Sequence, residues 1–282
     1  MLSRISFLIF ALYLAGSYPL FAQNEAPFAW CIVPFDKMER SPGERIEMLK
    51  ELGIRTYAYD WREKHLPEMA EEFQLAQENG IDINAVWMWI NPAVDSINGL
   101  GDANRQVLET IGKTGLHTTL WVSFQPDFFK GLSDEQAVQK GAKMIYYLYD
   151  QCQKIGCKIA LYNHGDWFGD PENQIRIIRT LGRYDIGLVY SFHHAHDQLE
   201  NFPELAKKMV PFLVAVNLNG MTDNGPQIYP LGKGDHEREM ISALEMAGYK
   251  GPYGILGHKE EADVKLILEE NLKGFHRLFE SM

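Results

Sequence analysis

One pattern repeats along the sequence from residue 28 to its end. An apolar run of strand length is followed by a polar turn, and then by a segment with apolar residues three and four positions apart. The first spacing is typical of a buried strand and the second of an amphipathic helix. The predicted strands span 28–35, 55–61, 82–90, 117–124, 158–164, 186–192, 212–219 and 251–258, and the predicted helices span 41–54, 66–81, 102–116, 133–157, 171–184, 202–211, 235–249 and 261–281.

Local capping residues support several of these boundaries. Ser41 and Ser133 precede helical segments as N-caps, and Pro42 takes the first helical position after Ser41. The Asn79-Gly80 pair is expected to stop the second helix. Eight alternating units in about 250 residues, with no linker-like break, predict a single (β/α)8 barrel over residues 23–282. A doubly wound open sheet is the alternative, and it requires a reversal of strand order.

The N-terminal segment 1–22 is predicted to be a secretory signal peptide. It has a basic residue, Arg4, then an apolar run from Ile5 to about Gly16, and small residues before a cut after Ala22. A retained membrane anchor is the alternative, but the run is short for a span of about 20 residues. We therefore expect a periplasmic protein without a stable membrane anchor.

Charge and cysteine content narrow the function classes. The formal net charge is −11 and no long basic run is present, so a nucleic-acid partner is not expected. A small, weakly charged ligand is easier to accommodate, and a homo-oligomer stays open. Cys31, Cys152 and Cys157 are expected to be buried apolar residues, although one pair could form a disulfide in an oxidising compartment.

Polar residues at the carboxyl ends of the strands are the candidate site, because barrels of this type place their chemistry there. Five of the nine histidines fall at these ends, namely His164, His193, His194, His196 and His258. One isolated histidine is more often a satisfied structural residue. Histidines ending the fifth, sixth and eighth strands together favour a Zn, Mn or Co ion.

Two further features suggest contacts to a sugar. Trp61, Trp87, Trp89 and Trp167 lie near strand ends, where they either pack the barrel or form a floor for a sugar ring. The glycine-rich stretch around Lys233 is a weak signal for an anion site, and we favour a lid or a contact to a substrate hydroxyl.

The sequence resembles the xylose-isomerase-like TIM barrels of the sugar phosphate isomerase/epimerase superfamily. The segments "MLKELGIRTYAYD", "IGLVYSFHHAHD", "PLGKGDHE" and "YGILGH" carry the resemblance, which covers nearly all of the chain after the signal. Members of that family typically bind a divalent metal with Glu, Asp, His and Glu from strands five to eight. Here these positions fall on Tyr162, Ser191, Asn217 and His258, with one family histidine kept as His194.

The resemblance therefore implies either a metal site rebuilt from histidines or one that is lost. We predict His164, His194 and His258 as ligands of Mn, Co or Zn, with Asn217 as a further ligand. His196 or His193 is predicted to be the catalytic acid or base. Asp60, Trp87, Tyr162 and Lys233 are predicted to contact the substrate.

The segments "YNHGDWFG" and "FHHAHD" are similar to those of secreted Bacteroidetes 3-keto-glucoside 1,2-lyases. That likeness implies removal of the proton at C2 and β-elimination of the C1 substituent. Two alternatives stay open. A sugar isomerase or epimerase would share the proton abstraction and keep the glycosidic bond, and a non-catalytic sugar-binding protein would have a decayed metal site.

Overall fold

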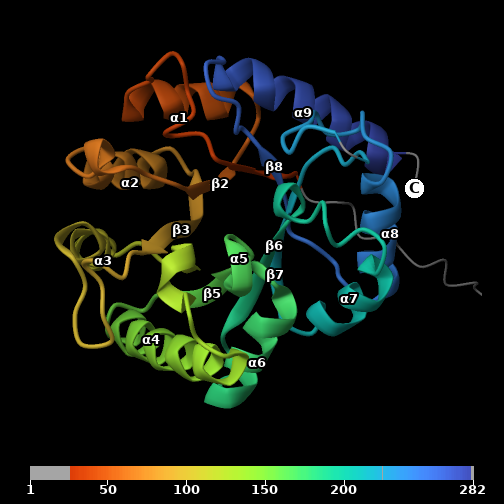
Figure 1. Cartoon of the computed structure of the whole chain (residues 1–282). Coiled ribbons are helices and arrows are strands. Elements are labelled where there is room, and N and C mark those ends of the chain that lie inside the picture. The colour runs from red at the N-terminus through yellow and green to blue at the C-terminus, as the bar shows by residue number, and fades with distance from the viewer. Residues whose placement is uncertain (1–25, 224, 281–282) are drawn as a thin grey trace, which may run out of the picture.

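The computed structural model describes residues 26–223 and 225–280, and its strands form one closed parallel barrel in chain order. The barrel closes because the first strand pairs with the last, Phe28 opposite Gly254 and Trp30 opposite Leu256. This pairing confirms the predicted (β/α)8 barrel and excludes the open sheet (Figure 1). The strands are β1 (Phe28–Trp30), β2 (Thr56–Tyr59), β3 (Asp82–Ile90), β4 (Thr119–Phe124), β5 (Lys158–Tyr162), β6 (Gly187–Ser191), β7 (Leu213–Leu218) and β8 (Tyr253–Leu256).

The helices form a ring around the strands (Figure 1). A capping box at Ser41 and Glu44 starts the first helix, Ser133 caps the fourth, and Gly80 follows the second with a positive φ of 64°. The four-residue α5 was not predicted. The helices are α1 (Pro42–Glu51), α2 (Met69–Glu78), α3 (Asp102–Thr114), α4 (Asp134–Lys154), α5 (Asp166–Gly169), α6 (Pro171–Leu181), α7 (Phe202–Met209), α8 (Glu237–Met246) and α9 (Val264–Glu280).

Several strands end earlier than the apolar pattern predicted. The first strand was predicted to reach residue 35 but stops at Trp30, because Cys31 has a φ of 59° that an extended strand does not allow. The fifth stops at Tyr162, and the His164 amide then donates to the Tyr162 carbonyl at 2.7 Å. After Ser191 the chain enters a 3-10 turn, Phe192–His194. Because the fifth and sixth strands end early, His164, His193 and His194 lie in the tight turns that follow these strands, at the carboxyl end of the barrel.

Aromatic side chains fill the barrel interior. The Trp30 and Trp121 rings lie 5.1 Å apart, and Trp121 stacks on Tyr162 at 6.0 Å. Gly254 is required in this layer, because a Cβ there would lie 2.3 Å from the Phe28 ring. The barrel is thus a packed core, and any ligand site must lie above it.

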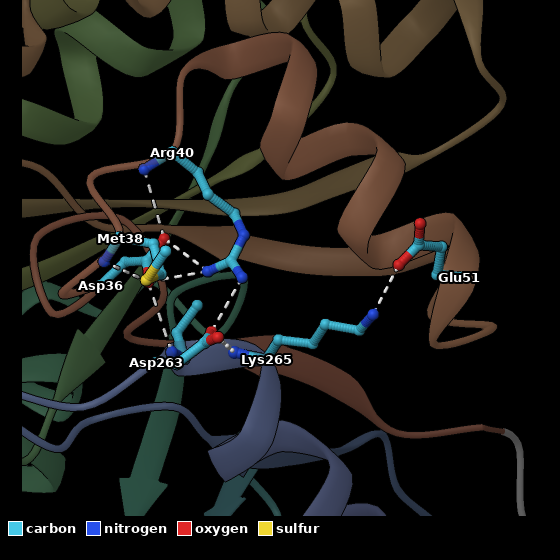
Figure 2. A network of polar contacts seen from close by, with 7 residues as sticks. Asp36, Met38, Arg40, Glu51, Asp263 and Lys265 are labelled. Atoms are coloured by element: carbon cyan, nitrogen blue, oxygen red, sulfur yellow. Dashed lines mark hydrogen bonds and ion pairs between the residues drawn. The ribbon is translucent and has the colours of Figure 1, made fainter.

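A polar network joins the first and last units of the barrel (Figure 2). Arg40 donates to Asp36 and, at 2.8 Å, to Asp263 just before α9. The Asp36 carboxylate also accepts from the backbone N–H groups of Met38, Arg40 and Val264. Both oxygens of the Asp36 carboxylate therefore have partners, and these partners link the first and last units of the barrel.

The cysteines and the N-terminal segment complete the comparison with the sequence. Cys31, Cys152 and Cys157 are buried and unbridged, as expected of small apolar residues. Within residues 26–223 and 225–280, no helix is both long and apolar enough to cross a membrane. The predicted signal peptide, residues 1–22, lies outside the described residues.

Candidate functional site

A small cavity of about 200 Å³ lies at the carboxyl ends of the strands, directly above the packed interior. We call it the inner cavity. Residues from β1, β2, β3, β5 and β8, or from the turns after the strands, form most of its wall, so tertiary closure of the barrel brings them together. Its wall consists of Trp30, Cys31, Phe35, Asp60, Arg62, Trp87, Tyr162, His164, His193, His194, Gln227 and His258.

Four of the five histidines that the sequence predicted at strand ends converge in this cavity. The His164 and His194 rings lie 4.4 Å apart, and His193 and His194 lie 3.6 Å apart. His258 lies 6.0 Å from His193 and packs on Phe35 at 3.7 Å. Strand ends five, six and eight thus meet at one point, as the closed barrel requires.

These imidazoles are neutral near pH 7. Burial lowers the pKa of His164 and of His258 to about 4. The pKa values of His193 and His194 lie well below the ordinary value. Burial is the larger cause and the neighbouring imidazoles are the smaller one. The cavity therefore offers uncharged ring nitrogens that accept or donate hydrogen bonds.

Two of these ring nitrogens are buried without a hydrogen-bond partner, His164 Nδ1 and His194 Nε2. By contrast, His193 Nδ1 lies 2.8 Å from the Ser191 hydroxyl. Buried polar atoms usually have partners, so unpartnered nitrogens in a cavity wall are free for a ligand.

Asp60 is the buried acid of the inner cavity, only 2% exposed. One oxygen accepts from the Val33 amide at 3.3 Å, and Oδ2 has no hydrogen-bond partner among residues 26–223 and 225–280. Burial raises the pKa of this carboxyl to about 6, although the positive charge of Arg62 opposes the shift. Such a group changes protonation close to neutral pH, which suits proton transfer.

Arg62 follows the predicted second strand directly, was not among the predicted site residues, and also lines the inner cavity. Its guanidinium lies 5.3 Å from the Phe35 ring and 5.7 Å from the Trp87 ring, and it donates to the Trp61 carbonyl at 2.8 Å. Over the described part of the chain, no carboxylate forms an ion pair with it. The sequence signal for Arg62 was its position two residues after Asp60 on an extended segment, because residues two apart on such a segment face the same way.

Two of the predicted substrate contacts also line the inner cavity. The Tyr162 hydroxyl accepts from Trp30 Nε1 at 3.1 Å, and burial keeps the pKa of this phenol well above its ordinary value. Trp87 donates from Nε1 to the Ser123 hydroxyl at 3.2 Å and leaves its ring facing the cavity.

The remaining predicted site residues lie elsewhere. His196 bonds through Nε2 to the Gln227 carbonyl at 3.0 Å and lines a neighbouring cavity together with His193 and His194. Asn217 is fully buried inside the barrel, with both amide atoms unpartnered. Lys233 forms an ion pair with Glu270, away from the inner cavity.

The donor chemistry of the inner cavity partly fits a divalent metal. The unpartnered nitrogens of His164 and His194 are two neutral imidazole donors. Among residues 26–223 and 225–280, however, no three His, Cys, Asp or Glu side chains are arranged to hold a metal ion. The family's acidic ligands are absent from the corresponding strand ends.

The closed barrel, with polar residues at the carboxyl ends of its strands, has the architecture of a known family of barrels. The family described as "Xylose isomerase-like TIM barrel" matches residues 46–277, and the chain belongs to this family. A search of curated protein sequences finds no match.

Solved structures of sugar epimerases share the fold. The 3-keto-D-glucoside 4-epimerase YcjR from E. coli is 13% identical, with a TM-score of 0.65 over 90% of this chain and 99% of the epimerase. A D-psicose 3-epimerase, solved in the presence of D-fructose, is 15% identical, with a TM-score of 0.67 over 89% and 98%. The IolI protein with a bound zinc atom is 14% identical, with a TM-score of 0.68 over 90% and 99%. At these identities the likeness establishes the fold.

Proposed function

We propose that this protein is an enzyme that removes a proton next to the carbonyl group of a keto-sugar, and that its reaction is the β-elimination of a 3-keto-glucoside. One observation carries the proposal. The inner cavity encloses a carboxyl group with a pKa of about 6 and a free oxygen, a permanently charged guanidinium, and several neutral imidazoles. These are the groups that proton abstraction and oxyanion stabilisation require.

In the proposed step, the base takes the proton from C2 of the sugar, which the C3 carbonyl acidifies. A double bond forms between C1 and C2, and the bond between C1 and the aglycone oxygen breaks. The electron pair leaves with the aglycone, which is then protonated. The products are a 2-hydroxy-3-keto-glycal and the free aglycone, and the balance needs no oxidant or organic cofactor.

Asp60 is the best placed base, because it is mostly ionised at pH 7 and its Oδ2 has no competing hydrogen bond. Arg62 supplies the positive charge for the oxygen at C3, since it lies in the same wall and lacks a carboxylate partner in the described chain. When no ion is bound, the neutral His164 and His194 orient the sugar hydroxyls. Assignment of the acid or base role to His193 or His196 stays a prediction that variants will test.

A divalent Mn, Co or Zn ion is part of the proposal. His164 and His194 would hold it, with His258 in the same wall as the third predicted ligand. When bound, the ion would polarise the carbonyl oxygen as a Lewis acid. The predicted export also stays a proposal, with the reaction placed in the periplasm.

A sugar epimerase is the second candidate. The structures that share the fold include enzymes named as 3-keto-D-glucoside 4-epimerase and D-psicose 3-epimerase. An epimerase would use the same proton abstraction and then return the proton to the opposite face.

The experiment is turnover of 4-nitrophenyl and methyl 3-keto-glucosides in D₂O, with and without a chelator. Release of the aglycone with glycal absorbance supports the lyase, and loss of release on chelation, restored by Mn, Co or Zn, supports the metal. Deuterium in an epimerised sugar whose glycosidic bond is intact supports the epimerase. Saturable binding with neither change points to a sugar-binding protein and overturns both enzyme candidates.

A further inference from the structure

A second, larger cavity adjoins the inner cavity on the side of β2, β3 and β4. Its volume is about 830 Å³, and it shares Arg62, Trp87 and His164 with the inner cavity. We call it the outer cavity. The rest of its wall includes Trp61, Trp89, Asn91, Asp95, Ala103 and Asn104.

The two cavities differ in what they can contain. Sites that bury whole drug-sized ligands have volumes of about 300–1,000 Å³. The inner cavity, at about 200 Å³, lies below that range, and the outer cavity, at about 830 Å³, lies within it. A glycoside whose sugar ring fills the inner cavity would extend its C1 substituent into an adjoining cavity. The outer cavity and the cavity lined by His196 both adjoin it, and of these two the outer one has tryptophans in its wall.

Three tryptophans dominate the outer wall. The Trp87 and Trp89 rings lie 5.3 Å apart at 45°, and Trp89 meets the His164 ring edge-on at 4.6 Å. Trp61 donates from its indole nitrogen to the Trp87 carbonyl at 2.7 Å, which fixes its ring. Trp87 and Trp89 are partly exposed, so their faces remain available for contact.

The polar groups around Asp95 in the same wall are bonded to one another. The Asp95 carboxylate accepts from the amides of Asn91 and Gly101 and from the Asn104 side chain, each at 2.8 Å. Asn104 also donates to the Trp89 carbonyl at 2.9 Å. With these bonds made, the Asp95 carboxylate and the Asn104 amide nitrogen are not available to the hydroxyl groups of a second sugar ring, and a buried hydroxyl without a partner is costly.

We propose that the outer cavity is a binding subsite for an aromatic aglycone, so that the substrates are aryl glycosides. The inference rests on the proposed function for the identity of the sugar ring, whereas the subsite itself rests on the tryptophan wall. An aromatic ring gains contact area and ring–ring attraction there without needing hydrogen bonds.

The test is equilibrium binding by calorimetry with glucosides that are not oxidised and cannot be eliminated. Phenyl glucoside is expected to bind about tenfold more tightly than methyl glucoside, as one aromatic pair contributes. Trp89→Ala should remove this preference. Trp167→Ala is the matched control and should keep it, because Trp167 packs on Phe129 and donates to Asp134 outside both cavities.

A second variant protects the test against a folding defect in Trp89→Ala. Ala103 lines the outer cavity at the start of α3 and is only partly buried, so Ala103→Phe should fold and obstruct the cavity. It should weaken phenyl glucoside about tenfold and leave methyl glucoside unchanged.

Equal affinity of phenyl and methyl glucoside in the wild-type protein would overturn the subsite. Tighter binding of cellobiose than of phenyl glucoside would identify a second sugar as the occupant and also overturn it. The proposed function fails independently: if neither 3-keto-glucoside is turned over while the phenyl preference depends on Trp89, the subsite stands and the lyase does not.

Discussion

Two buried carboxylates of the second barrel unit, Glu72 and Asp60, have very different surroundings. Glu72 is fully buried and accepts from Arg45 at 2.8 Å and from the Tyr57 hydroxyl at 3.0 Å. Asp60 is equally buried but receives only one long bond, from the Val33 amide. The comparison shows that burial alone does not identify a site. A buried acid with all its partners holds helices together, and one with a free oxygen beside a cavity is available for chemistry.

The largest expected effect is on stability and comes from the fully partnered acid. Glu72→Ala leaves Arg45 buried without its partner, which costs about 3–5 kcal/mol of unfolding free energy. Urea unfolding measures this. Glu71→Ala, an exposed neighbour on the same helix, is the control and should change stability by less than about 0.5 kcal/mol. Equal effects of the two substitutions would contradict the structural role of the pair.

Asp60→Asn should lower activity without lowering stability, in contrast to Glu72→Ala. Loss of the proposed base lowers kcat/KM on the 3-keto-glucoside by about 10²–10⁴-fold. The unfolding free energy should not fall, because the substitution removes a buried charge with one weak partner. Steady-state kinetics and urea unfolding on the same preparation check both statements. Retained activity would move the base role to His193 or His196, to be examined with His193→Ala and His196→Ala.

The contributions of Asp60 to activity and to stability should respond to pH in opposite directions. The folded pKa of Asp60, about 6, lies above the ordinary value of 3.8, so its stability contribution is fully present below pH 3.8 and is lost as pH rises through 6. The difference between these two pKa values corresponds to at most about 3 kcal/mol of unfolding free energy. Over the same interval kcat/KM should rise as the base ionises. The histidines His164 and His258 act on stability in the other direction. Their folded pKa values of about 4 lie below the ordinary value of 6.5, so their contribution is present above pH 6.5 and is lost as pH falls through 4. In kcat/KM they should add no step above pH 5.

The control for this pH dependence is Asp60→Asn, which should lose that component of the stability change. Unfolding midpoints at pH 4, 5, 6 and 7 for both proteins provide the comparison. Identical pH profiles would show that Asp60 does not titrate in this range.

The smallest expected effects are those of lysine substitutions at Arg62 and at Arg45, and the two should differ in kind. Arg62→Lys should lower kcat/KM about tenfold with unchanged stability, because a lysine keeps the charge but not the planar group stacked near Phe35 and Trp87. Arg45→Lys should instead lower stability by about 1–3 kcal/mol, since the buried two-point contact with Glu72 is broken. A stability loss at Arg62 as large as at Arg45 would remove the contrast.

Much of the fold was predictable, because helix and strand periods are local properties of the sequence. The third strand was predicted with its observed bounds, Asp82–Ile90, and the caps at Ser41 and Ser133 are present. Strand ends were less accurate where a single backbone angle decides them, as at Cys31. The convergence of His164, His194 and His258 in one cavity follows from barrel closure and strand order.

The sequence by itself determined the eight-unit barrel and the end of it that carries the polar residues. Only the tertiary structure decided which of those residues are free to act. Asp36 and Asp60 both follow a strand, yet Arg40 and three backbone amides occupy Asp36, while Asp60 keeps a free oxygen. The physical reason is that a buried polar group depends on its hydrogen-bond partners, and several of these partners come from segments far away along the chain.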